Sequence, residues 1–288
     1  MKFAFIQEHK TCWPITAMCR VLGVSRSGYH AWRQRPPSVR ARRREQLAAQ
    51  ARAVHEANRG VYGSPRVYHA LLAQGVKVCV NTVAKVMRWA GIAGKKKRKF
   101  VPRTTDSSMT HQPAPNLLER HFTPGKAGER WVSDITYVPT HEGWLYLAAV
   151  LDLGTRKIVG WAMAAEMKAG LALDALRMAL TRRGPGRAEQ LLHHSDRGVQ
   201  YASDDYQRLL EDQRIRVSMS GKGDCYDNAA MESFWATLKT ELIHEEDYAT
   251  HEQAQGSIFE YIEVFYNRVR LHSTLGYVSP EAFEASLI

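Results

Sequence analysis

The order of strand-like and helix-like segments between residues 131 and 220 limits the folds open to this chain more than any other feature. Aromatic and β-branched runs of alternating polarity indicate strands, and a short turn joins the second run to the third, as in antiparallel neighbours. The segments are strands at 131–139, 144–152 and 157–164, a helix at 171–182, a strand at 191–196, a helix at 204–212 and a strand at 215–220. This order predicts an α/β fold with a mixed five-stranded sheet flanked by helices.

Charge is divided unevenly along the chain. Residues 1–118 hold 22 basic and 4 acidic side chains, a net charge of +18, whereas residues 119–288 hold 18 and 25, a net charge of −7. A basic segment of this density is typical of proteins that bind a polyanion, because each Lys or Arg that neutralises a phosphate releases condensed counterions. Nucleic acid is therefore the expected partner of the first half.

Neither a membrane nor an oxidising compartment is expected. No apolar run approaches the ~18 residues that a membrane-spanning helix needs, and no signal peptide is evident at the N-terminus. The cysteines form no CxxC pair, and we interpret them as reduced thiols; they are Cys12, Cys19, Cys79 and Cys225. We expect a cytoplasmic, nucleoid-associated protein.

A helix-turn-helix is predicted within residues 14–34, where a Gly-containing turn separates two short amphipathic segments and Ser25 can cap the second. Arg26, Ser27 and His30 would then face a DNA groove from the start of the second helix. An ordinary helical hairpin is the alternative. The residues expected to form its small core are Ala17, Leu22, Val24, Tyr29 and Trp32.

The chain is predicted to contain four parts. Residues 1–44 form the helix-turn-helix region, and residues 45–94 form a second helical, helix-turn-helix-like DNA-binding region. Residues 95–118 form a basic flexible linker, and residues 119–288 form the α/β core with a C-terminal helical tail. The linker opens with a basic run that either follows a DNA backbone or is merely solvated; this run is Lys95, Lys96, Lys97, Arg98 and Lys99.

Three carboxylates stand where the predicted topology converges: Asp134 in the first strand, Asp196 at the end of the fourth and Glu232 in the helix that follows. Phosphodiester chemistry uses two divalent cations, one activating the attacking oxygen and one stabilising the leaving oxygen, and carboxylate oxygens suit Mg²⁺. A single such Asp is more often a strand cap or a surface ion pair. The three together predict a Mg²⁺ site, with Mn²⁺ as a substitute.

Two further positions lie on the helical face of Glu232. Asn228 and Lys239 are four residues before and seven residues after it, so all three share one side of a helix. We expect Asn228 and Lys239 to contact DNA, Lys239 by holding the backbone near the reacting phosphate. His194 shares a strand face with Asp196 and either touches the DNA or metal-bound water, or has a supporting or packing role.

The phrases WVSDITYV, HHSDRGVQYAS, YDNAAMESFWATLKTEL and FYNRVRLHSTLGYVSP resemble the integrase-like (OrfB-type) transposases of copy-out-paste-in bacterial insertion sequences, which belong to the DDE superfamily related to retroviral integrases. The resemblance spans nearly the whole chain. It implies a ribonuclease-H-like core, with Asp134, Asp196 and Glu232 as the catalytic triad and Lys239 as the family's later lysine.

By the same resemblance, the expected function is DNA strand cleavage at insertion-sequence ends followed by transfer of the freed 3′-hydroxyl to another strand, without a covalent protein intermediate. The expected partners are double-stranded DNA, in the form of terminal inverted repeats and target DNA, and further copies of the chain on that DNA. Such elements commonly fuse the transposase to an upstream-frame product with its own coiled-coil and DNA-binding parts. The absence of a sustained heptad repeat leads us to expect those parts to come from such a partner.

Two other functions fit some of the same residues. A ribonuclease-H-class nuclease would use the same carboxylates to cut without joining, although the basic first half argues against it. A DNA-binding repressor with a decayed core would act through residues 1–94, although all three carboxylates are present. Strand transfer from a pre-cleaved end distinguishes the first alternative, and metal-dependent cleavage excludes the second.

Overall fold

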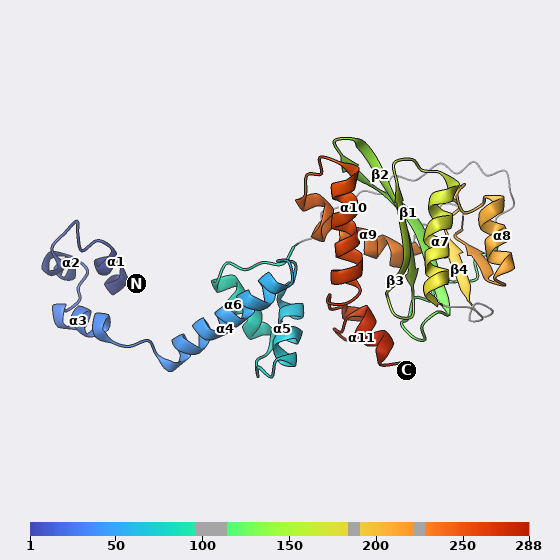
Figure 1. Cartoon of the computed structure of the whole chain (residues 1–288). Coiled ribbons are helices and arrows are strands. Elements are labelled where there is room, and N and C mark those ends of the chain that lie inside the picture. The colour runs from blue at the N-terminus through green and yellow to red at the C-terminus, as the bar shows by residue number, and fades with distance from the viewer. Residues whose placement is uncertain (96–113, 184–190, 222–227, 288) are drawn as a thin grey trace.

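The computed structural model describes residues 1–95, 114–183, 191–221 and 228–287. Two groups of helices lead to an α/β core, and the first group lies at the opposite end of the molecule from the core (Figure 1). Within the described ranges, no helix has the length and apolar character needed to cross a membrane. The basic run Lys96–Lys99 lies outside the described residues, so its predicted DNA contact stays a prediction.

The first group contains three short helices around a small core. Buried side chains come from all three helices, and Ser25 caps the third by accepting a hydrogen bond from the Gly28 N–H, as expected. The predicted core is wrong at Ala17, which is exposed because Met18 and Cys19 carry the buried side of that helix. Trp32 is also 37% exposed. The helices are α1 (Lys2–Glu8), α2 (Ile15–Val21) and α3 (Arg26–Gln34).

The second group is built on a long helix, α4 (Val39–Ala57), against which α5 (Ser64–Ala73) and α6 (Val80–Trp89) pack. Apolar side chains at helical spacing, among them Ala51 and Val83, are fully buried between the three helices. The predicted boundary between residues 44 and 45 falls inside α4, which continues from the connection after α3 into this group.

The predicted mixed five-stranded sheet is confirmed. Its strand order is β3-β2-β1-β4-β5; β1, β2 and β3 are antiparallel neighbours, and β4 and β5 continue parallel to β1. The parallel strands β4 and β5 are only four residues long; β4 is buried throughout and β5 in its second half, which suits strands between two helical layers. The strands are β1 (Arg130–Thr140), β2 (Gly143–Asp152), β3 (Ile158–Ala164), β4 (Leu192–Ser195) and β5 (Arg216–Met219).

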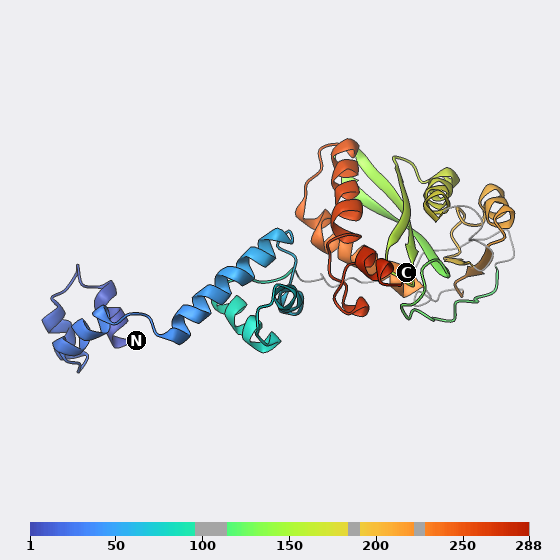
Figure 2. The same cartoon turned by 60° about the horizontal axis from the view of Figure 1, so that its bottom comes forward.

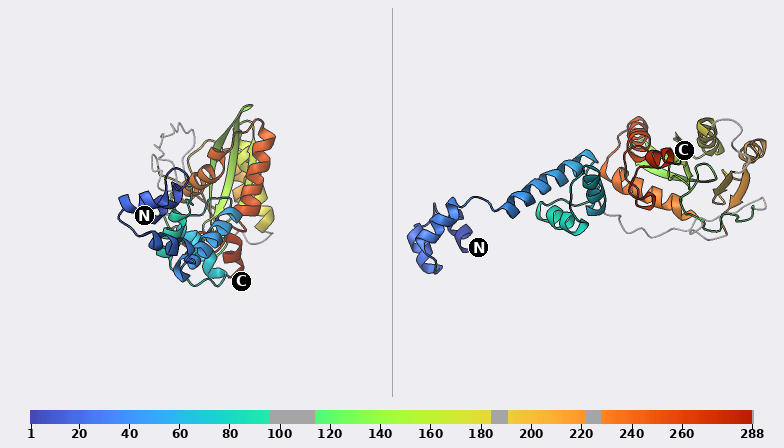
Figure 3. Two further views of the ribbon diagram at one scale, coloured as in Figure 1. Left: turned by 90° about the vertical axis from the view of Figure 1, so that its left-hand side faces the viewer. Right: turned by 90° about the horizontal axis from the view of Figure 1, so that it is seen from below.

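Helices cover both faces of the sheet, as Figures 2 and 3 show. One face packs against α7 (Ala169–Arg183) and α8 (Asp204–Asp212), and the other against α9 (Ala229–Glu241) and α10 (His251–Phe259). Alternation along β1 explains this, since successive side chains point to opposite faces of a strand. Trp131 accordingly packs with α7, while Val132 packs on the α9 side.

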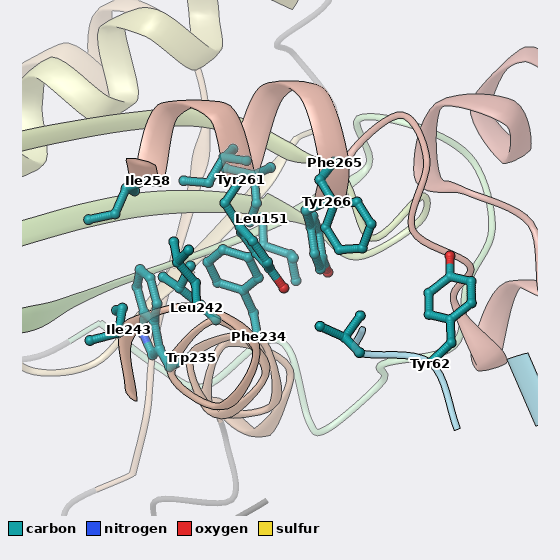
Figure 4. Packing of buried hydrophobic residues seen from close by; sticks show 14 of the residues in the cluster. Tyr62, Leu151, Phe234, Trp235, Leu242, Ile243, Ile258, Tyr261, Phe265 and Tyr266 are labelled. Carbon is teal, nitrogen blue, oxygen red and sulfur yellow. The ribbon is translucent and has the colours of Figure 1, made fainter. Parts of the chain in front are cut away.

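The segment after α10 turns back against the second helical group. The hydroxyl of Tyr62 donates to the Val269 carbonyl at 3.3 Å and accepts from the Leu271 N–H at 2.8 Å. Arg66 Nε donates to the Leu271 carbonyl at 2.8 Å. Figure 4 shows Tyr62 beside this segment, close to the aromatic cluster that fills the core. The segment comprises the π-helical turn η3 (Glu260–Tyr266), the 3-10 turn η4 (Ser273–Leu275) and α11 (Pro280–Ala285); a 3-10 turn η2 (Ile243–Glu245) follows α9.

A buried ion pair fixes the end of α9 to the same segment. Arg270 donates two hydrogen bonds, at 2.6 and 2.7 Å, to the carboxylate of Glu241, and the Tyr261 hydroxyl donates a third at 2.8 Å. Only 4% of the Arg270 side chain and 7% of the Glu241 side chain are exposed. A pair with this geometry satisfies both charges, which burial would otherwise make costly.

The close packing of α7 on β3 makes a prediction about Gly160. A Cβ atom at Gly160 would lie 2.2 Å from the Ala175 carbonyl oxygen and 2.7 Å from the Ala179 N atom, both in the α7 backbone. Gly160→Ala should therefore lower the free energy of unfolding by about 1–3 kcal/mol through overpacking, as measured by denaturant titration. Gly256→Ala, in α10 where nothing lies within 4 Å, is the control and should hold or raise stability. Equal effects of the two changes would contradict the packing argument.

Candidate active site

The parallel pairing of β1 with β4 brings two aspartates together at one edge of the sheet. Ser133 pairs with Ser195 in the register of the two strands, and each serine is followed directly by an aspartate, Asp134 in β1 and Asp196 after β4. Neighbouring strands lie about 4.8 Å apart, so residues at matching positions are neighbours. Asp134 and Asp196, which are 62 positions apart in the sequence, thus share one site.

Hydrogen bonds orient both aspartates. The Asp134 carboxylate accepts from the Trp235 indole N–H at 2.9 Å with one oxygen and from the Ile135 backbone N–H at 2.8 Å with the other. Asp196 accepts from the Gly198 backbone N–H at 2.9 Å. The Trp235 contact also joins α9 to β1, because Trp235 lies one helical turn after Glu232 on that helix.

The three carboxylates influence one another electrostatically. Burial, followed by the charge of Asp196 and, more weakly, that of Glu232, raises the pKa of Asp134 to about 7, while the two donated hydrogen bonds lower it. Burial also raises the pKa values of Asp196 and Glu232. Like charges held close together resist ionisation unless a cation balances them. Within the described ranges, the acidic, His and Cys side chains do not form a closed cluster of three metal ligands, and Glu232 is exposed.

Lys239 lies beside this group, as its spacing from Glu232 predicts. Its pKa is lowered by burial and raised by the charge of Asp134, so the ammonium group is close enough to feel that carboxylate. The Lys239 Nζ atom is 4.9 Å from the centre of the Tyr137 ring, a cation–π distance. Lys239 is half-buried and retains an open side.

Asn228 occupies a different position from its helix neighbours. It is the N-cap of α9 and only 6% exposed, whereas Glu232 on the same helix is exposed. Its Oδ1 atom is buried and has no hydrogen-bond partner in the part of the chain that the structure describes. A DNA contact by Asn228 therefore stays a prediction.

His194 has the packing role that the sequence left open. It is fully buried, and its two ring nitrogens lie 2.8 Å from the Ser218 hydroxyl and 3.1 Å from the Ser220 hydroxyl. The adjacent His193 faces the other side of β4 and contacts the Ser133 and Tyr206 hydroxyls at 2.8 and 3.0 Å. His193 thus ties β4 to β1 and α8, and His194 ties β4 to β5.

The other predicted DNA contacts lie outside this site. Arg26 and Ser27 are exposed at the start of α3, and His30 is half-buried against the Tyr29 ring. Lys95 contacts the core, with its Nζ atom 3.3 Å from the Glu245 carboxylate and donating to the Glu241 carbonyl at 3.3 Å, and its predicted DNA contact stays a prediction. The residues that sequence reasoning missed are Trp235, Tyr137 and the buried Tyr201, whose pKa is raised well above its usual value by burial, by Tyr206 and by both aspartates.

Comparisons with known proteins agree with this geometry. A family model described as an integrase core domain matches residues 124–225, a second model with the same description matches residues 213–280, and a model of an HTH-like domain matches residues 42–100. Together the two core models cover the sheet, both aspartates and the helix that carries Glu232.

Curated relatives match over the full chain. The transposase InsF for insertion sequence IS3A of Escherichia coli (strain K12) is 45% identical over 288 residues, which cover 99% of this chain and 98% of the relative. A 31 kDa protein of insertion element IS600 from Shigella sonnei is 45% identical over 266 residues, covering 92% and 97% of the two chains.

Solved structures of viral integrases are more distant. The simian T-cell lymphotropic virus intasome structure matches with a TM-score of 0.46 and 14% identity over 81% of this chain and 74% of that chain. The HTLV-2 integrase catalytic core domain in complex with magnesium matches with a TM-score of 0.40 and 11% identity over 55% and 97%. The full-length identity to the curated relatives, together with the two matched domain types, shows that the chain belongs to the IS3 family of insertion-sequence transposases, with an integrase core domain behind an HTH-like domain.

Proposed function

We propose that this transposase cuts DNA at the ends of its insertion sequence and joins the freed 3′-hydroxyl to a second strand, with Asp134, Asp196 and Glu232 as the catalytic residues. The observation that carries the proposal is the register of β1 and β4, which sets the two aspartates side by side. Glu232 on α9 is near enough to affect the ionisation of Asp134. Family membership supports DNA transposition as the overall activity.

The residues present fit a divalent metal site. The donors are carboxylate oxygens, which Mg²⁺ and Mn²⁺ prefer, and the pKa of Asp134 is raised by burial and by the charges of Asp196 and Glu232, which a cation would balance. Asp134, Asp196 and Glu232 would hold the metal. When bound, such ions activate the attacking oxygen and stabilise the leaving oxygen of the phosphodiester.

Neighbouring groups of the chain prepare this site. Trp235 and Ile135 each donate to one oxygen of Asp134, and this fixes the carboxylate plane while leaving the remaining lone pairs for a ligand. The Gly198 N–H does the same for Asp196. Lys239 holds a DNA phosphate beside the carboxylates, since its ammonium group is close to Asp134.

The remaining parts of the chain supply DNA binding and assembly. The four-part division at residues 44, 94 and 118 stays a proposal, in which Arg26, Ser27 and His30 of α3 contact terminal repeats. Oligomers of the chain on DNA would bring two ends and a target together. An upstream-frame partner would supply coiled-coil and further DNA-binding parts, and the complex would act at the nucleoid.

The first test replaces the carboxylates singly. Asp134→Asn, Asp196→Asn and Glu232→Gln should each abolish end cleavage and strand transfer while leaving DNA binding largely intact, because each change removes a ligand charge and no groove contact. Gel-based cleavage and pre-cleaved-end joining assays measure the two steps, and electrophoretic mobility shifts measure binding. Joining by any one variant would remove that residue from the catalytic set, and cleavage without joining in the unaltered protein would favour a nuclease.

The raised pKa of Asp134 leads to a prediction about stability and pH without metal. Between the unfolded value, near 4, and the folded value of about 7, the folded state binds more protons, so this group makes folding less favourable as pH rises through that window. Asp134→Asn removes the penalty and should exceed the unaltered protein in stability at pH 8 but not at pH 4.5. Thermal melting in EDTA at both pH values measures this, and a constant difference between the two proteins would contradict it.

Lys239 is tested through its charge. Lys239→Ala should weaken DNA binding by roughly two- to fivefold, the range of a partly exposed charge contact, and should lower cleavage mainly at low DNA concentration and at raised salt. Lys239→Arg should retain part of the activity because it keeps the charge. Lys168→Ala is the control, since the Lys168 side chain is 78% exposed on another part of the core. Unchanged cleavage rates for Lys239→Ala at all DNA concentrations would show that Lys239 does not contact the DNA.

A further inference from the structure

Two aromatic side chains stand half-exposed at the edge of the candidate active site. Tyr137 in β1 and Trp144 in β2 are 53% and 51% exposed. Their rings meet edge to face, with centroids 4.8 Å apart and an interplanar angle of 76°. This arrangement leaves ring surface of both residues open to solvent, although aromatic side chains gain free energy when they are buried.

The strand register explains how the two rings meet. Tyr137 pairs with Tyr146, and Trp144 pairs with Pro139, so all four side chains lie on the same face of the β1–β2 hairpin. The pairing of β1 with β4 ends at Ser133. The outer end of β1 is thus free of that neighbour where Tyr137 lies.

The pair is adjacent to the catalytic residues. Tyr137 follows Asp134 by three positions in β1, about 10 Å along the strand, and this odd spacing turns the two side chains to opposite faces of it. The Lys239 Nζ atom lies 4.9 Å from the Tyr137 ring centre and also feels the charge of Asp134. Lys239 therefore links the aromatic pair to the carboxylates.

We propose that Tyr137 and Trp144 form a stacking platform for an unpaired nucleobase of the DNA end next to the phosphate that is cut. An aromatic surface beside a cation is the combination that binds single-stranded nucleic acid, because the rings stack on the base while the cation contacts the backbone. This inference rests on the proposed function and adds a base-binding subsite to it.

A second aromatic pair in the same core, with one exposed ring, offers a comparison in a different setting. Phe259 is 51% exposed and meets Trp161 edge to face, at a centroid distance of 5.9 Å. The indole N–H of Trp161 donates to the carboxylate of Glu263 at 2.6 Å, and that carboxylate also forms an ion pair with Arg182 at 2.8 Å, so the charges beside that pair neutralise each other. Phe259 thus provides a matched control for Trp144.

The test uses the full chain carrying Asp196→Asn, so that DNA is bound without being cut. The probes are a terminal-repeat duplex with a three-nucleotide single-stranded overhang that contains 2-aminopurine, and the same duplex with a blunt end. Stacking quenches 2-aminopurine fluorescence. Adding Trp144→Ala to this parent chain should remove the quenching. It should weaken binding of the overhang duplex by roughly fivefold or more, the size of one base–aromatic stack, and leave binding of the blunt duplex unchanged.

The other variants separate stacking from structural effects. Trp144→Phe should retain most of the quenching because it keeps an aromatic face, and Phe259→Ala should change neither binding nor quenching. Tyr137→Leu should remove quenching and also weaken blunt binding, since it removes the ring beside Lys239.

Persistent quenching in Trp144→Ala, or an equal loss of overhang and blunt binding in that variant, would overturn the platform while leaving the proposed function in place. Failure of the parent Asp196→Asn chain to bind either DNA, together with failure of the unaltered chain to cut it, would overturn the proposed function and the platform with it.

Discussion

The candidate active site depends on the parallel hydrogen bonding between β1 and β4. This pairing joins two strands that are separated in sequence by β2, β3 and α7, and its register places Ser133 opposite Ser195. A shift of one residue would turn the side chains of one strand to its other face. Asp134 would then lose both its neighbour Asp196 and its hydrogen bond from Trp235. The buried His193 of β4 supports this register through the Ser133 hydroxyl of β1, 2.8 Å away, whereas His194 contacts Ser218 of β5.

Helix α9 brings the third carboxylate and is fixed at both its middle and its end. Phe234 and Leu238 are buried against the sheet, and the C-terminal Glu241 forms the buried ion pair with Arg270. Loss of one partner would leave an uncompensated buried charge, at a cost of about 3–5 kcal/mol. Arg270 lies in the segment that Tyr62 and Arg66 contact. The HTH-like domain and α9 are therefore connected through one partly buried network.

Much of the core could be predicted from residue patterns because strand alternation and helix caps are local properties. All five strands and the helices between them occur where the alternating runs stand, with ends within a few residues of the expected ones. The motifs also identified the two aspartates that the structure brings together. The small core around α2 was less predictable, since Ala17 and Met18 are both apolar and only contact with α1 decides which of them is buried. The contact of Lys95 was also not predictable from local patterns, because its ion pair with Glu245 joins residues 150 positions apart.

The sequence by itself determined the order of elements, the division of charge between the two halves and the identity of the acidic residues, since these follow from composition and short-range periodicity. Only the tertiary structure decided which side chains share the site. It placed Trp235 on Asp134, Lys239 over Tyr137, and Tyr137 against Trp144. These contacts depend on how far one element turns and slides on another. That geometry is set by the packing of the whole core, and spacing along the chain does not record it.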